Sequence, residues 1–233
     1  MNNYQEFKIF LYLGLKEITV TVFDDKDDQI YQDIFIKEKD LYETNEVILN
    51  TFLDRNIYKI EKHINIFVKE INLVIDTDLF KSISISTKRK SFGKKITFYE
   101  MKQMLFEIRE EIKKDNVDET IIHMLIKNYF ANGQKLNYLD KELNCDNLII
   151  EVEFICLSNH FINELNKKFK HYQVEINKII SANYVRNFNS NSKLSINQAA
   201  FKVLKGENFN EVLIVPKNTN KMGFFEKFFY LFS

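Results

Sequence analysis

The chain has 233 residues, enough for one domain or two small ones, and its 33 basic and 33 acidic side chains give a formal net charge of zero. A neutral chain lacks the basic face with which proteins wrap a nucleic-acid backbone, so nucleic-acid binding is excluded. Only 5 glycines and 1 proline are present. Because phosphate-cradling loops need glycine where the backbone approaches the ligand, an ordinary nucleotide site is not expected.

The two cysteines, Cys145 and Cys156, form no CxxC pair and are too few for a disulfide scaffold. No metal site is expected, because four scattered histidines do not complete a cage with them. The N-terminus shows no signal peptide, and no apolar run approaches the ~20 residues that span a bilayer. We therefore expect a cytoplasmic chain that does not cross a membrane. The histidines are His63, His123, His160 and His171.

The first half of the chain begins with strand patterns. Three β-rich runs with short connections predict a meander, and a long amphipathic pattern then predicts a helix. Thr97 and Glu100 have the spacing of a capping box, which predicts the start of a second helix. The expected strands cover residues 7–15, 17–24, 30–36, 71–75 and 80–86, and the expected helices cover residues 41–69 and 97–114.

The second half continues with strands and helices that do not alternate strictly. Asn132-Gly133 predicts a tight turn after an apolar strand. The polar residues 187–195 predict an internal linker, and residues 216–220 a polar tether. The mixture indicates an α+β fold. The expected strands cover residues 118–130, 147–157 and 174–180, and the expected helices cover residues 160–171 and 196–205.

The C-terminal tail has the pattern of a helix that lies in a membrane interface. On a helical wheel its apolar side chains occupy an arc of about 160°, with cations beside them. Aromatic residues in the acyl boundary and cations at the headgroups are typical of such helices. The alternative is a terminal helix that docks on the chain's own core. The expected membrane-binding residues are Lys221, Phe224, Phe225, Lys227, Phe228, Phe229, Leu231 and Phe232.

One local cluster of basic residues interrupts the otherwise balanced charge. It is expected on an exposed hairpin or loop, where it would contact anionic lipid or an acidic partner, or would simply be a solvated loop. The cluster consists of Lys88, Arg89, Lys90, Lys94 and Lys95.

Several stretches resemble one known family in the same order along the chain. Residues 13–20 (LGLKEITV) stand where that family has its first phosphate-contacting turn, and residues 122–134 (IHMLIKNYFANGQ) resemble one of its strands and turns. The family is FtsA, the bacterial actin-like cell-division proteins that hold the division ring to the membrane. The resemblance implies an α+β fold: a partial actin-like (ribonuclease H-like) subdomain of mixed sheet, an inserted small α/β subdomain, and a C-terminal amphipathic helix.

The resemblance also implies a division of the chain into parts. The first part of the actin-like subdomain would cover residues 1–70 and its return residues 159–215, on either side of an inserted FtsA-type subdomain at 71–158. A tether at 216–222 would lead to a membrane-targeting helix at 223–233.

The chain departs from the family at the nucleotide site. Tyr12 stands where the family has an acidic residue, two positions before Gly14, so the first phosphate turn is degenerate. A second glycine-rich phosphate turn and the second half of the nucleotide-binding fold are missing. The resemblance therefore implies neither ATP binding nor any other cofactor, and no ATPase activity.

The function that follows is a non-enzymatic, FtsA-like adaptor at the division site, on the cytoplasmic face of the inner membrane. Its partners would be anionic lipid and divisome proteins, with FtsZ bound indirectly, and self-association is an open possibility. The alternative is a membrane-associated assembly platform for another machine, such as the actin-like platform of type IV pili.

An enzyme is the third hypothesis. Ser158 with His160, or the paired carboxylates of Glu151 and Glu153, would have to act as catalytic groups. A helix N-cap and a solvated strand face explain these residues more simply. His123 lies in an apolar strand and is expected to be a hydrogen-bonded structural residue.

Overall fold

The computed structural model describes residues 6–37, 45–138, 142–190 and 192–213. The chain divides into two compact units, each with its own hydrophobic core, and each is described by itself below. Unit 1 comprises Met1–Asp78 and Phe161–Leu204, and unit 2 comprises Leu79–His160 and Lys205–Ser233.

Unit 1 is built on a five-stranded mixed sheet with the order β11-β4-β1-β2-β3. β2 is antiparallel to both of its neighbours, whereas β1, β4 and β11 are parallel. This order, with β2 alone reversed, is that of the ribonuclease H-like fold on which actin-like proteins are built. The predicted α+β, actin-like fold is therefore confirmed. The strands are β1 (Lys8–Leu13), β2 (Glu17–Phe23), β3 (Gln29–Ile36), β4 (Glu70–Ile75) and β11 (Glu175–Ser181).

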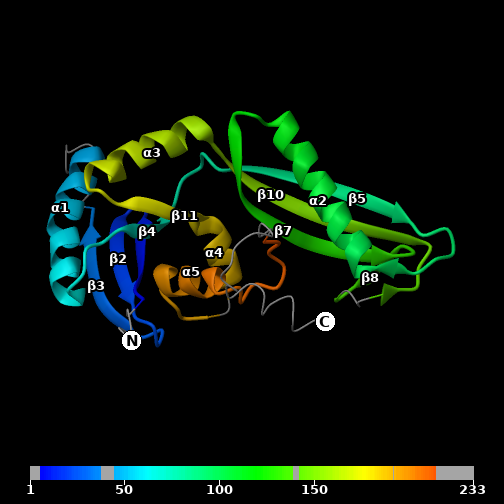
Figure 1. The fold of residues 1–233 in the computed structure, drawn as a ribbon, viewed down its shortest axis with the longest axis horizontal. Helices are drawn as coiled ribbons and strands as arrows, with labels where there is room; N and C mark the ends of the chain where they lie inside the picture. Colours follow the sequence, from blue (N-terminus) through cyan, green and yellow to red (C-terminus); the bar gives the residue numbers. More distant parts are fainter. Residues whose placement is uncertain (1–5, 38–44, 139–141, 191, 214–233) are drawn as a thin grey trace. The chain divides into compact units, whose positions relative to one another are not determined.

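Helices cover both faces of this sheet because successive side chains of β1 point to opposite faces. Ile9 and Leu11 pack toward α1 and α3, while Phe10 and Tyr12 pack toward α4 and α5. Figure 1 shows the two pairs of helices on either side of the strands. The helices are α1 (Asn45–Ile64), α3 (Asn159–His171), α4 (Ala182–Phe188) and α5 (Ile196–Leu204).

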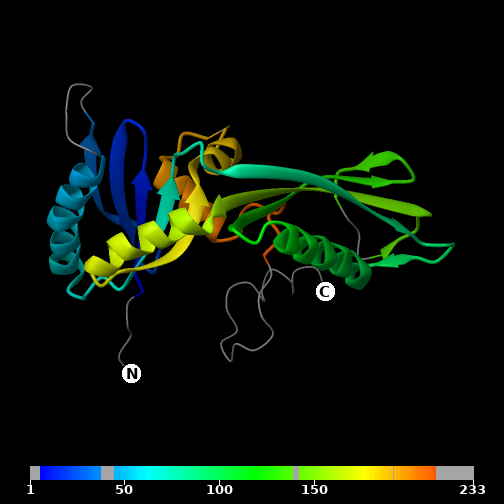
Figure 2. The ribbon, with the colours of Figure 1, turned by 90° about the horizontal axis from the view of Figure 1, so that it is seen from above.

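Unit 2 is a four-stranded antiparallel sheet, ordered β5-β10-β7-β8, with one face covered by α2. Met101, Met104 and Ile108 of α2 are buried in one cluster with Ile150 and Phe154 of β10. Figure 2 shows α2 lying along the sheet. The elements are β5 (Lys81–Lys90), β6 (Ile96–Thr97), α2 (Phe98–Asp115), β7 (Glu119–Ala131), β8 (Gln134–Leu136), β9 (Glu142–Leu143) and β10 (Asn147–Ser158), with β6 and β9 paired separately.

The last described residues run along the edge of β7. This edge segment (residues 208–212) accepts a hydrogen bond from Ile126 N at Asn210 O (2.8 Å) and donates one from Val212 N to Met124 O (2.8 Å). Between them, the buried Glu211 carboxylate lies 2.7 Å from Nδ1 of His123. The prediction that His123 has a hydrogen-bonded structural role is confirmed.

The structure corrects several predicted boundaries. The expected helix over residues 41–69 ends at Ile64, because Asn65 adopts a left-handed conformation (φ 57°). α4 takes up the start of the predicted linker at 187–195. The structure places β4 in the sheet of unit 1, whereas the sequence-based boundary put residue 71 onward in the insertion. That strand pairs with β1, about sixty positions earlier in the chain, so local patterns give no sign of it.

Candidate functional site

The carboxyl ends of β1, β4 and β11 meet at one edge of the sheet of unit 1. In open sheets of this kind, ligands bind at that edge. Tyr12 lies near the end of β1, Asp76 follows β4 directly, and Arg186 lies on α4, which begins as soon as β11 ends. The Ser181 side chain caps α4 by accepting a hydrogen bond from Tyr184 N. Three chain segments far apart in sequence thus bring three polar side chains together.

These side chains form a closed hydrogen-bonded set, called here the Tyr12–Asp76–Arg186 network. The Arg186 guanidinium donates to Asp76 Oδ1 at 3.0 Å, to Asp76 Oδ2, and to the Tyr12 hydroxyl at 2.8 Å. The Tyr12 hydroxyl in turn donates to Asp76 Oδ2 at 3.2 Å. The guanidinium therefore bridges the other two groups, which also bond to each other.

The network fixes the charge of its members. The hydrogen bond from Arg186 is the main reason why the pKa of the Asp76 carboxyl lies below its ordinary value of 3.8. The same hydrogen bond raises the pKa of Arg186, and burial is the main cause that raises the pKa of Tyr12. At neutral pH the site contains a carboxylate, a guanidinium and a neutral phenol.

The turn from β1 to β2 is folded against this network. A Cβ placed on Gly14 would lie 2.6 Å from atoms of the Tyr12 ring, so the ring covers the glycine closely. Lys37 Nζ donates to Gly14 O at 2.9 Å, and the backbone at Leu15 adds a small contribution to the lowered pKa of Asp76. In the turn where the resemblance placed a degenerate phosphate contact, the Tyr12 ring and the chain's own carboxylate thus lie together.

A groove of about 330 Å³ opens beside the network, lined by Tyr12 and Arg186 and by residues of β2, β3 and α5. Asn197, which is fully buried, donates from Nδ2 to Thr19 O (3.1 Å) and to Thr21 Oγ1 (3.0 Å). Among the described atoms, Asn197 Oδ1 and Thr19 Oγ1 find no hydrogen-bond partner. Both oxygens are buried, so they are not exposed to the groove that their residues line.

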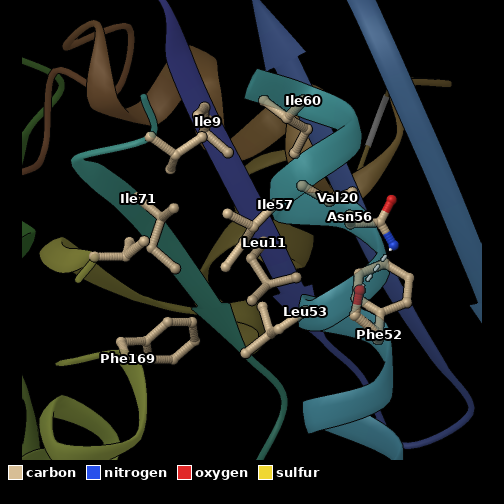
Figure 3. Close-up of a pocket in the computed structure, with 12 residues that line it drawn as sticks. Ile9, Leu11, Val20, Phe52, Leu53, Asn56, Ile57, Ile60, Ile71 and Phe169 are labelled. Atoms are coloured by element: carbon tan, nitrogen blue, oxygen red, sulfur yellow. Dashed lines mark hydrogen bonds between the residues drawn. The ribbon is translucent and has the colours of Figure 1, made fainter. Parts of the chain in front are cut away.

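A second cavity, of about 20 Å³, lies in the core of unit 1 between the sheet and α1 (Figure 3). Its walls are apolar apart from Asn56. That amide accepts from the Tyr31 hydroxyl (2.7 Å) and donates to Phe52 O (3.0 Å), so it offers nothing to a ligand. This cavity is a packing void and not a binding site.

The predicted basic cluster gathers at one end of the sheet of unit 2. The sequence predicts an exposed hairpin or loop; the first three members are instead the last residues of β5, because β5 stays paired with β10 up to Lys90. Arg89 lies 3.8 Å from Glu100, and Lys95 lies 3.0 Å from Glu142. Lys88 and Lys90 are exposed and have no ion-pair partner within the described part of the chain.

The predicted membrane-binding residues of the tail lie outside the described residues, as do the tether and the targeting helix. They are Lys221, Phe224, Phe225, Lys227, Phe228, Phe229, Leu231 and Phe232. Within the described ranges, no helix is both long and apolar enough to cross a membrane.

The residues considered for catalysis have structural partners. Glu151 accepts from Asn128 Nδ2 at 2.6 Å, and Glu153 pairs with Lys127 at 3.1 Å, as a strand face in contact with solvent would predict. Cys156 is a free, buried thiol, and burial raises its pKa to about 11. No group of side chains suited to a metal ion occurs among residues 6–37, 45–138, 142–190 and 192–213.

Sequence reasoning missed Asp76 and Arg186. The role of Asp76 was partly predictable, since a polar residue directly after a buried parallel strand marks the ligand-binding edge of a sheet. Arg186, 110 positions later, gives no such sign.

No protein-family model and no curated protein matches the sequence. Three solved structures are similar in fold. A chain of the PilM–PilN type IV pilus biogenesis complex is 8% identical, with a TM-score of 0.46 over 76% of this chain and 48% of that chain. The cytoplasmic domain of EpsL, an inner membrane component of the type II secretion system of Vibrio cholerae, is 8% identical, with a TM-score of 0.36 over 77% and 57%.

The third is a Bacteroides thetaiotaomicron protein of actin-like ATPase fold and unknown function. It is 12% identical, with a TM-score of 0.34 over 84% of this chain and 61% of that chain. The chain thus spans between about half and three fifths of the length of the solved chains that it matches.

Proposed function

We propose that this chain is a non-enzymatic adaptor with an actin-like fold, which holds partner proteins at the cytoplasmic face of a membrane-bound assembly machine. One observation supports the non-enzymatic part above all: the Tyr12–Asp76–Arg186 network occupies the turn that a nucleotide phosphate would need. Unit 1 then serves as a folded scaffold for partner contacts and not as a nucleotide-binding domain.

The physical argument concerns charge. A phosphate in this turn would lie beside the Asp76 carboxylate, which is already hydrogen-bonded to Arg186 and Tyr12. Two anions in one site repel each other, and the guanidinium is already engaged by the carboxylate. The ring of Tyr12 over Gly14 adds a steric barrier.

A direct test is the effect of Mg-ATP on thermal unfolding. At about 100 times its Kd, a ligand stabilises the native state by about 2.7 kcal/mol, which is readily detected. We expect no change in unfolding temperature for the intact chain, with a non-hydrolysable ATP analogue giving the same result. A magnesium-dependent rise in the unfolding temperature, or ATP hydrolysis that is lost in a Gly14→Leu variant, would contradict the proposal.

Two machines are candidates. The first is a pilus or secretion platform, since the similar structures include a chain of the PilM–PilN complex and the cytoplasmic domain of EpsL, an inner membrane component. The second is an FtsA-like adaptor of the division site, which would contact divisome proteins and, indirectly, FtsZ. The hairpin from β7 to β8 supports it, because Asn132-Gly133 makes the turn that the FtsA resemblance predicted.

Co-purification of the tagged chain from its native cells separates these two machines. Retention of a pilus or secretion protein of the inner membrane would support the platform. Retention of FtsZ or another division protein would support the division adaptor. A chain that retains neither, and that sediments alone after crosslinking, is not an adaptor of either machine.

A further inference from the structure

The turn that joins β5 to β6 has an unusual residue at its apex. Lys94 N donates to Ser91 O at 3.1 Å, and both central residues are left-handed, with φ of 51° at Phe92 and 79° at Gly93. Two left-handed central residues define a type I′ turn, which favours Asn-Gly. A bulky side chain in this conformation is strained.

The hairpin from β7 to β8 in unit 2 provides an internal comparison. Its central residues, Asn132 and Gly133, have φ of 51° and 82°, nearly the same as those of Phe92 and Gly93. The chain therefore uses the favoured Asn at one turn and Phe at the other. The phenylalanine is not compensated by packing, because Phe92 is 88% exposed, the highest value among the exposed large hydrophobic residues. Strain and exposure without any gain within the fold indicate a role outside it.

Cations lie on both sides of this ring in the sequence. Lys88 and Lys90 precede it on β5, and Lys94 and Lys95 follow it, all four exposed. Tyr99, 75% exposed, lies in the first turn of α2, the helix to which this turn leads (Figure 1). Lys95 pairs with Glu142 and Lys94 interacts electrostatically with Glu100, whereas Lys88 and Lys90 have no ion-pair partner within the described residues.

We propose that this turn (residues 88–95) is a lipid-contacting element that inserts Phe92 into an anionic membrane surface. The aromatic ring would enter the boundary between headgroups and acyl chains, while the flanking lysines stay at the level of the lipid phosphates. Charge complementarity selects an anionic surface, and the single apolar apex distinguishes this element from a purely solvated lysine loop. The inference goes beyond the adaptor role and does not depend on it.

The sharpest test uses the absence of tryptophan from the chain. A Phe92→Trp variant has a single tryptophan, at the apex, and selective excitation of tryptophan over the 11 tyrosines makes the emission report on this residue. Vesicles of phosphatidylglycerol and phosphatidylethanolamine should shift the emission to shorter wavelength, and phosphatidylcholine vesicles should not. A matched Phe106→Trp variant, with the probe on the half-exposed outer side of α2, should show no shift with either vesicle.

Affinity is tested with substitutions that preserve the fold. Phe92→Asn converts the turn to the Asn-Gly form already present in unit 2, so the unfolding temperature should stay equal or rise while vesicle binding falls. Lys88→Gln/Lys90→Gln should weaken binding by about 5- to 30-fold, since each lysine near an anionic surface contributes up to about fivefold. Lys59→Gln/Lys62→Gln on α1, which changes the net charge equally, is the control.

Both sets of variants are compared in the intact chain and in a Phe225→Glu/Phe228→Glu background, which removes the predicted tail contribution. If the Phe92 variant binds vesicles less well but retains its protein partners as the parent does, the result would support the proposal. The adaptor function would then be unaffected. An unshifted Phe92→Trp emission, or a Phe92→Asn variant that binds vesicles normally but loses a protein partner, would overturn it.

Discussion

Asp76 accepts hydrogen bonds from Arg186 and Tyr12 at the edge of the sheet where a ligand would be expected. The two donors come from different segments of unit 1, α4 and β1. The Asp76 carboxylate therefore links β1 to α4. Its negative charge lies at the edge of the sheet where an anionic ligand would otherwise bind. The same residue determines how the site responds to acid.

Substitution of Asp76 by Asn should lower the free energy of unfolding by about 1–2 kcal/mol at neutral pH, because it leaves Arg186 without its charged acceptor. The loss is kept modest by solvent screening, since the Arg186 side chain is 45% exposed. Urea denaturation of the two proteins measures the difference. Asp78→Asn, at an exposed position two residues away, should leave stability unchanged.

The same difference should depend on pH. The pKa of Asp76 in the folded state lies below its ordinary value of 3.8, so its stabilising contribution is fully present above that value and is lost as the pH falls through the lower, folded value. The gap between the parent protein and Asp76→Asn should thus close below about pH 4. A gap that persists at pH 2 would show that the effect is steric and not electrostatic.

At the scale of single elements, α2 begins at a complete capping box. The Thr97 side chain accepts from Glu100 N, and the Glu100 carboxylate accepts from Thr97 N at 2.8 Å. Thr97 and Glu100 are only three positions apart, so the sequence alone predicts this helix start. The Asn132-Gly133 turn was predictable for the same reason, because the conformation depends on two adjacent residues.

Thr97→Ala should destabilise the protein by about 1 kcal/mol, because one backbone donor of the first helical turn loses its acceptor. Thr97→Ser retains the hydroxyl and should restore most of that loss. Thermal unfolding followed by circular dichroism measures both variants. Equal unfolding temperatures for Ala and Ser would mean that the cap contributes nothing to stability.

Other elements could not be predicted because their causes lie far away in the chain. β4 belongs to unit 1 through parallel pairing with β1, and the Asp76–Arg186 contact spans 110 positions. α4 escaped detection because it is only seven residues long and polar on its exposed side. Lys88 to Lys90 form the end of a strand because β10 continues opposite them, which the basic composition of that stretch does not reveal.

At the scale of the whole molecule, each of the two units has hydrophobic packing of its own among the described residues, and the chain passes from one unit to the other after Asp78, after His160 and after Leu204. Leu53 is buried in unit 1, whereas both cysteines are buried in unit 2 as free thiols. The thiols therefore report on the opening of unit 2 alone. Since each unit has a core of its own, we expect the two to open independently.

Leu53→Ala should cost about 3 kcal/mol in unit 1 through lost contacts and the cavity left behind. If the units open independently, the rate at which a thiol reagent labels Cys145 and Cys156 should change less than about twofold, whereas full coupling would raise it by more than about 100-fold. Met104→Ala, in the core of unit 2, is the positive control and should accelerate labelling. Strong acceleration by Leu53→Ala would show one cooperative unit.

The edge segment at residues 208–212 has a mechanical consequence. Its backbone hydrogen bonds to Ile126 and Met124 lie across the direction of the chain, and the buried His123–Glu211 contact lies between them. A tension applied along the chain from residue 213 would load these bonds in shear, all at once, instead of peeling them one by one. Whatever pulls on the C-terminal end of this protein therefore pulls on the long central strands of unit 2 and not on a loop.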